Sequence, residues 1–232
     1  MSTLLECREL TKNFGGKTAV DHINLCIESG HIIGLLGPNG SGKTTLIKMI
    51  NGLLTPSSGT LYFKENPIGV ESKKHISYLP DHTYLNMNER VSDIIDFFTD
   101  FYEDFDTARA YDMLEKLSIS PSDRLKTMSK GTKEKVQLIL VMSRRADLYV
   151  LDEPIAGVDP AARDYILNVI LSNYEPSASI LISTHLIADI ENILDEVIFI
   201  QNGQIRLSSS VDEIRAAEGK SVDTLFREVF KC

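Results

Sequence analysis

The chain has 232 residues, a formal net charge of −9 and a hydrophobic fraction of 43%. This length suffices for one large domain, or one domain with a subdomain, without disulfide bonds. Its ordinary hydrophobic and charged fractions exclude a disordered or collagen-like protein. The acidic balance argues against nonspecific binding to duplex nucleic acid, so we expect no nucleic-acid partner; a local cationic pocket for a small anion is compatible with it.

Apolar and helical patterns alternate along the chain. Short segments with flanking turns predict a lobe of antiparallel strands at residues 4–10, 22–27 and 59–64. Continuous apolar runs predict buried parallel strands at residues 31–36, 75–79, 147–151, 179–183 and 196–200. Helices are expected to follow at residues 42–51, 160–173 and 186–194. This order is typical of an α/β fold.

The middle of the chain shows helical patterns alone. Three helices are predicted at residues 91–104, 107–118 and 129–146, and two short amphipathic helices close the chain within residues 210–231. We therefore expect an α/β core with its β lobe, residues 1–81 and 147–232, and a helical subdomain, residues 82–146.

Cysteine usage and hydropathy suggest where the protein works. Cys7, Cys26 and Cys232 are scattered and lack C-x-x-C spacing, which indicates reduced thiols in a cytosolic protein rather than a disulfide framework or a zinc site. The N-terminus shows no signal-peptide pattern. The longest apolar run, residues 136–142, is too short to cross a bilayer, so we expect this chain not to span a membrane by itself.

A glycine-rich segment between a predicted strand and a predicted helix matches G-x-x-x-x-G-K-[ST] in full. Its glycines leave room for phosphate oxygens, and its amides with the helix N-terminus would bind the anion. Lys43 would bridge the outer phosphates, and the Thr44 hydroxyl would ligate Mg²⁺. The alternative is a glycine-rich turn without a ligand. The residues expected to bind ATP here are Gly37, Pro38, Asn39, Gly40, Ser41, Gly42, Lys43, Thr44 and Thr45.

Two carboxylates end the strand predicted at residues 147–151. Beside a phosphate and Mg²⁺ site, Asp152 would hold the metal, and Glu153 would polarise a water aimed at the γ-phosphate. The alternative is a strand that simply reaches the surface.

With these elements the chain resembles an ATPase subunit of the ABC family, which implies a RecA-like P-loop NTPase core. The segment Ser129-Lys130-Gly131-Thr132 resembles the family's signature, which faces the ATP held by a second subunit. Residues 152–159 resemble the Walker B strand end and the D-loop, so that Asp159 would contact the dimer partner.

The same resemblance implies two further nucleotide contacts. His185, in Ser183-Thr184-His185, matches the family's switch histidine and would contact the γ-phosphate, and Phe14 lies where an aromatic ring stacks on adenine. These two assignments, and those of Ser129 and Asp159 above, each have an alternative that involves no nucleotide or partner. Ser129 and Asp159 are also good helix N-caps, while His185 and Phe14 could belong to the core.

Some positions depart from the family pattern. Asp81 stands after Leu-Pro where the family usually has glutamine, and would still ligate Mg²⁺ unless it is a surface-loop residue. Lys130 and Thr132 replace a signature glycine and glutamine; Lys130 would either face the partner's phosphate or point to solvent. Such departures resemble a subgroup of prokaryotic exporters tied to peptide, antibiotic or lipid-linked substrates.

An acidic segment rich in aromatic residues follows, and its five rings have helical spacing. They form either a buried face of the helical subdomain or, in part, a groove for a membrane subunit's helix. The rings are those of Phe97, Phe98, Phe101, Tyr102 and Phe105.

We therefore predict an ATPase that dimerises around ATP and Mg²⁺, as a homodimer or heterodimer, and drives an integral membrane transporter subunit from the cytoplasmic face of the membrane. The alternatives are a soluble ABC-type ATPase in another cytosolic process and a different P-loop NTPase.

Overall fold

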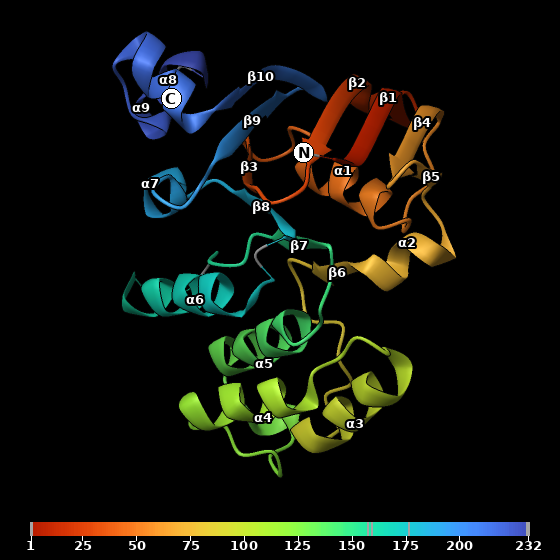
Figure 1. The fold of residues 1–232 in the computed structure, drawn as a ribbon, viewed down its shortest axis with the longest axis vertical. Helices are drawn as coiled ribbons and strands as arrows, with labels where there is room; N and C mark the ends of the chain where they lie inside the picture. Colours follow the sequence, from red (N-terminus) through yellow and green to blue (C-terminus); the bar gives the residue numbers. More distant parts are fainter. Residues whose placement is uncertain (1, 157, 159, 176, 231–232) are drawn as a thin grey trace.

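An antiparallel sheet forms the N-terminal lobe of the computed structural model, which describes residues 2–156, 158, 160–175 and 177–230 (Figure 1). Its strands lie in the order β2-β1-β4-β5 and are β1 (Thr3–Phe14), β2 (Lys17–Glu28), β4 (Ser58–Phe63) and β5 (Asn66–Pro67). The predicted β lobe is confirmed. Its first two strands are longer than expected, because their hairpin continues to the Phe14–Lys17 pair and turns through two glycines with positive φ.

The second sheet carries the predicted core strands in the order β10-β9-β3-β8-β7-β6. Its strands are β3 (Ile32–Leu36), β6 (Ile76–Leu79), β7 (Leu148–Asp152), β8 (Ser179–Thr184), β9 (Glu196–Gln201) and β10 (Gln204–Ser210). Each pair is parallel except β10 with β9. The carboxyl ends of β3, β6, β7 and β8 therefore share one edge of the sheet, where polar residues follow each strand.

Helices cover both faces of this sheet. Helix α1 (Lys43–Ile50) lies between the two sheets, and its apolar side chains share one cluster with strands of both. The opposite face carries the second apolar cluster, which includes residues of the helices α5 to α9. The helices flanking the sheet are α2 (Val70–His75), α6 (Pro160–Asn173), α7 (Ile187–Ile190), α8 (Val211–Glu218) and α9 (Val222–Phe230). This layering confirms the α/β fold with a P-loop NTPase core.

The chain between β6 and β7 is helical, as predicted, and lies at the lower end of Figure 1. It contains α3 (Val91–Phe101), α4 (Thr107–Lys116), a short 3-10 helix (Leu125–Thr127) and α5 (Lys130–Met142). Aromatic and aliphatic residues of all three α-helices join the larger apolar cluster.

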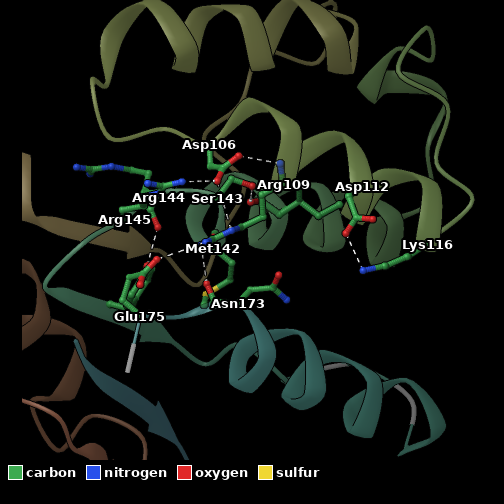
Figure 2. Close-up of polar contacts among 12 residues, drawn as sticks. Asp106, Arg109, Asp112, Lys116, Met142, Ser143, Arg144, Arg145, Asn173 and Glu175 are labelled. Atoms are coloured by element: carbon green, nitrogen blue, oxygen red, sulfur yellow. Dashed lines mark hydrogen bonds and ion pairs between the residues drawn. The ribbon is translucent and has the colours of Figure 1, made fainter. Parts of the chain in front are cut away.

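Arg109 of α4 ties these helices to α6 (Figure 2). Its guanidinium donates hydrogen bonds to the carbonyls of Met142, at the end of α5, and Asn173, at the end of α6, and it also pairs with Glu175. Asp106, the N-cap of α4, accepts from the Arg109 amide and pairs with Arg145. A cation at the carboxyl ends of two helices also interacts favourably with their dipoles.

Some predicted boundaries were wrong. The helix expected at residues 186–194 is only one turn, Ile187–Ile190, because the chain must enter β9, where the Asp195 amide bonds to Ile32. The helix expected at 91–104 ends at Phe101, since Tyr102 is extended. Helix α5 begins after its cap Ser129 and ends at Met142 rather than at residue 146. Strands β5 and β10 and helix α2 were not predicted.

Candidate functional site

The phosphate loop follows β3 directly and opens helix α1. Its glycines are required by close contacts: a Cβ at Gly37 would lie 2.3 Å from the Ile200 carbonyl, and one at Gly42 would lie 2.5 Å from the Ala19 carbonyl. Gly42 also has φ +114° and Gly40 has φ +76°, which side chains rarely adopt. Nothing lies within 4 Å of a Cβ built at Gly40. The loop is therefore tightly packed at Gly37 and Gly42 and open at Gly40.

The N-terminus of α1 faces this opening without a cap. Gly42, its N-cap residue, offers no side-chain hydrogen bond to the helix amides, and no acidic residue lies in the first turn. The Ser41 hydroxyl beside it is buried and has no hydrogen-bond partner. Free amides at a helix N-terminus carry a partial positive charge and bind phosphate. The predicted phosphate loop thus has the geometry of an anion site.

Lys43 is buried at the base of the loop. Its Nζ donates to the Gly37 carbonyl at 2.7 Å and to the Pro38 carbonyl at 3.3 Å, and lies 3.9 Å from Glu153 Oε1. Burial lowers the pKa of Lys43, and the charges of Glu153 and Asp152 oppose that shift. The ammonium is therefore placed between the phosphate loop and the acidic pair.

Asp152 ends β7 and is 1% exposed. One carboxylate oxygen accepts a hydrogen bond from the Ser183 hydroxyl of the neighbouring strand β8, and the other oxygen is buried without a partner. Burial raises the pKa of Asp152, while hydrogen bonds from Ser183 and Thr44 lower it, and the nearby charges of Asp81 and Glu153 raise it. This contact of Ser183 with Asp152 was not predicted, because a serine in an apolar run has no distinctive spacing.

Glu153 follows with φ +53°, a strained conformation for a non-glycine residue. Its amide donates to the Ser183 carbonyl at 3.0 Å and to the Ser183 hydroxyl at 3.1 Å, which holds the turn. Its side chain then lies between two groups: Oε1 is near Lys43, and Oε2 is 3.0 Å from Nδ1 of His185. The structure thus brings Lys43, Glu153 and His185 together.

The residues predicted to hold Mg²⁺ supply oxygen ligands, which that ion prefers. The unpartnered oxygen of Asp152, and a Thr44 hydroxyl close enough to lower the pKa of that carboxylate, fit such an ion beside the phosphates. Asp81 is half-exposed, contacts His82 Nδ1 at 2.7 Å, and lines the same cavity as Asp152. Among the described residues no three His, Cys, Asp or Glu side chains form a ready metal cage.

A cavity of about 540 Å³ connects these side chains. Asn39 of the phosphate loop, Asp81, Asp152, Glu153 and His185 all line it, as do Lys130 and Glu134 of helix α5. Asn39 of the phosphate loop, the acidic pair and His185 thus line one space, with Lys43 beside it through its pair with Glu153, and this space can accept a nucleotide polyphosphate.

Comparisons with known proteins agree with this geometry. A family model described as "ABC transporter" matches residues 20–156. The chain belongs to the ABC transporter family. It is 31% identical to the ABC transporter ATP-binding protein YtrB of Bacillus subtilis, over 91% of this chain and 74% of that protein.

Other relatives agree with the family assignment. The chain is 31% identical to the probable multidrug ABC transporter ATP-binding protein YbhF of Escherichia coli, over 98% of this chain but 41% of that protein. A solved ATP-binding subunit of an ABC transporter superposes with a TM-score of 0.88 at 28% identity, covering 98% of this chain and all of that one. The chain is therefore an ATP-binding subunit of an ABC transporter and an ATPase, and the alternative of a different P-loop NTPase is wrong. Such subunits dimerise and work with membrane permeases.

The segment predicted to be the ABC signature, residues 129–132, lies at the N-terminus of α5. Ser129 is its N-cap and accepts from the Thr132 amide at 3.2 Å, which confirms the capping interpretation. The Lys130 side chain is 84% exposed, and its nearest acidic partner is Glu134, at 3.8 Å. A Cβ at Gly131 would meet nothing within 4 Å. Asp159 of the D-loop lies outside the described residues.

Phe14 lies at the end of β1 and is 48% exposed, so it is not a core residue. Its ring faces the Lys12 ammonium at 5.2 Å. The adjoining strand β2 brings Ala19 against Gly42 of the phosphate loop. An exposed ring at the end of the strand that pairs with β2 is compatible with the predicted adenine contact.

The side chains of the aromatic segment differ in burial, and the predicted groove for a membrane subunit's helix stays a prediction. Phe98 and Phe105 are buried, whereas Phe97 and Phe101 are 60% and 66% exposed and stack on each other at 5.8 Å. A groove of about 700 Å³ lies beside them, between α1, β6 and α3. Its wall includes Phe97, Phe101, Tyr84, Tyr78, Lys48 and Lys73. Among the described residues, no helix is both long and apolar enough to cross a bilayer.

Proposed function

We propose that this subunit binds ATP with Mg²⁺ and hydrolyses it in the space between the phosphate loop and the acidic pair. Residues 37–45 hold the polyphosphate, Lys43 neutralises its outer oxygens, and Phe14 stacks on adenine. Thr44, Asp152 and Asp81 hold Mg²⁺, which supplies charge stabilisation to the phosphates when bound. The unpartnered oxygen of Asp152 and the uncapped N-terminus of α1 support this assignment.

The Glu153 carboxylate, held between Lys43 and His185, is the single observation that carries the proposal. A carboxylate in this position can accept the proton of an attacking water. His185 would contact the γ-phosphate while its Nδ1 keeps Glu153 in place. Lys43 would leave the loop carbonyls for the phosphates when these enter.

We also propose that the site is completed by a second subunit, in a homodimer or a heterodimer. The first turn of α5 is exposed, and Gly131 leaves open space around the backbone. Glycine in an exposed helix costs roughly 1 kcal/mol relative to alanine. A close approach by another molecule would account for it. The signature residues Ser129, Lys130, Gly131 and Thr132 would thus contact the partner's ATP, with Asp159 at the same interface.

The exposed aromatic groove is the proposed contact with an integral membrane subunit, and residues 82–146 would move as one subdomain against residues 1–81 and 147–232. Peripheral attachment at the cytoplasmic face of the membrane follows from this contact. Export is the proposed direction, because the Asp81 departure and the similarity to YbhF, named as a probable multidrug protein, both favour it. A soluble ABC-type ATPase without a membrane partner is the alternative.

Glu153→Gln tests the proposal. The amide keeps the shape of the side chain but cannot take a proton, so the variant should bind ATP with Mg²⁺, fall at least 100-fold in hydrolysis, on the order of a lost general base, and accumulate as a dimer. Phosphate release and size-exclusion chromatography with ATP measure these effects. Glu134→Gln is the matched control, because Glu134 lines the same cavity from α5. Wild-type turnover in Glu153→Gln would refute the assignment.

A further inference from the structure

Tyr78 of β6 is a buried polar group that the proposed chemistry does not use. Its hydroxyl is shielded from water and has no hydrogen-bond partner, as is true of the free oxygen of Asp152. Buried hydroxyls are nearly always hydrogen-bonded, because leaving one unsatisfied is unfavourable. A hydroxyl retained in this condition suggests that its partner arrives with a ligand.

The strand register places Tyr78 close to the metal site. It pairs with Val150, two residues before Asp152 on the adjacent strand β7, and lies three residues before Asp81. Burial raises the pKa of Tyr78, and the charges of Asp152 and Asp81 raise it further. Because paired residues and residues two apart on a strand share one side of the sheet, the Tyr78 hydroxyl, a hydrogen-bond donor, lies on the same side as the Asp152 carboxylate.

The ring of Tyr78 has a different environment from its hydroxyl. It packs on the apolar cluster that contains α1, and it lines the aromatic groove together with Lys48 and Asn51 of that helix. One side chain therefore lines the groove with its ring and stands on the strand next to β7, which ends in Asp152.

We propose that the Tyr78 hydroxyl donates a hydrogen bond into the ligand shell of Mg²⁺ at Asp152, making Tyr78 a positioning residue between the groove and the nucleotide. This rests on the proposed role of Asp152. Occupation of the metal site satisfies the hydroxyl, and a molecule seated in the groove contacts the same side chain.

Tyr78→Phe tests this proposal, because it removes the hydroxyl and keeps the ring. ADP is the probe, since it binds without hydrolysis, and calorimetry gives its affinity with Mg²⁺ and with EDTA. The gain in affinity from Mg²⁺ should fall about fivefold to tenfold, the range of one lost hydrogen bond, while the affinity in EDTA stays unchanged. The unfolding midpoint without ligand should be equal or higher, because the lost hydroxyl had no partner.

Two matched variants make the outcome decisive. Tyr84→Phe removes a hydroxyl from the same groove, but Tyr84 has Tyr102 and Arg144 as its charged or ionisable neighbours instead of the two carboxylates, so its Mg²⁺ gain should equal that of the wild type. Asp152→Asn should lose most of the gain. If Asp152→Asn keeps it, the proposed metal site fails; if Asp152→Asn loses it but Tyr78→Phe keeps it, the inference about Tyr78 alone is overturned.

A second measurement does not depend on a variant's affinity. With 3-fluorotyrosine incorporated, the fluorine resonance that disappears in Tyr78→Phe identifies Tyr78. That resonance should shift between ADP in EDTA and ADP with Mg²⁺, and the Tyr84 resonance should stay in place. An unmoved Tyr78 resonance would overturn the proposal.

Discussion

Lys43 and Asp152 are both held where burial disfavours their charged forms. Burial lowers the pKa of Lys43 and raises that of Asp152. The Ser41 hydroxyl and one oxygen of Asp152 are also buried without partners. Phosphate oxygens and a cation would supply charge and hydrogen-bond partners to these groups. These electrostatic features therefore favour binding of a phosphate with a cation.

Lys43→Ala removes the only side chain here that reaches from the phosphate loop to Glu153 among the described residues. We expect affinity for a nonhydrolysable ATP analogue to fall roughly tenfold to hundredfold, because a charge-assisted hydrogen bond contributes about 1.5–3 kcal/mol. Calorimetry measures the affinity. Lys48→Ala on the same helix should bind normally, since Lys48 lines the groove instead. Unchanged binding in Lys43→Ala would contradict the phosphate-loop assignment.

The motif residues of the site could be predicted from the sequence, but the residues that hydrogen-bond to them and hold them in place could not. Lys43, Asp152 and Glu153 stand at fixed positions relative to a glycine loop or a strand end. Ser183 bonds to both Asp152 and the Glu153 amide only because β8 pairs with β7 in register. That pairing joins residues about thirty positions apart in sequence, and a single serine in a strand gives no sign of it.

Helix α3 differs from the other helices in what it leaves exposed. Its residues Val91, Ile94, Ile95 and Phe98 are buried, while Phe97 and Phe101 project beside the groove. Two adjacent aromatic rings exposed to water are unusual on a protein surface and mark an interaction site. The α3 helix therefore both packs the helical segment and presents an apolar surface.

Replacing both Phe97 and Phe101 by serine should weaken attachment to a membrane subunit. Because both rings are largely exposed, the unfolding midpoint and basal ATPase activity should change little. Sedimentation of the purified protein with native membrane vesicles measures attachment, which we expect to fall at least tenfold, as for loss of central aromatic contacts. Val229→Ser on α9 controls for loss of an exposed apolar side chain. Equal sedimentation of the double variant would favour the soluble alternative.

Strands and helices could be predicted from the sequence where burial determines the pattern of apolar residues. The strands β3, β7 and β8 are buried along their whole length and appear as unbroken apolar runs. Strand β10 alternates between exposed and half-buried residues at the sheet edge, and α2 is a single short polar helix, so neither produced a clear signal. The helix beginning at Ile187 was overestimated because its apolar residues continue through turns before β9.

At the scale of the whole molecule, two helix N-termini differ in capping and in exposure. The N-terminus of α1 is uncapped and follows the phosphate loop, whereas that of α5 is capped by Ser129 and exposed around Gly131. Apart from its chain neighbours and its own helix backbone, no atom of the described residues lies within 4 Å of a Cβ built at Gly131, so the backbone there is open to a second subunit. Sharing each nucleotide between α1 of one subunit and α5 of the other would use both.

Mixing two inactive variants tests this sharing. Lys43→Ala disables the phosphate loop, and Ser129→Arg should obstruct the signature surface, so each homodimer has no working site. In a mixed dimer one site combines both defects and the other is intact; random pairing should therefore restore about a quarter of wild-type sites. Phosphate release after mixing measures recovery, and circular dichroism verifies that Ser129→Arg is folded after loss of its cap. A mixture no more active than its components, or two variants fully active alone, would contradict a site shared between identical subunits.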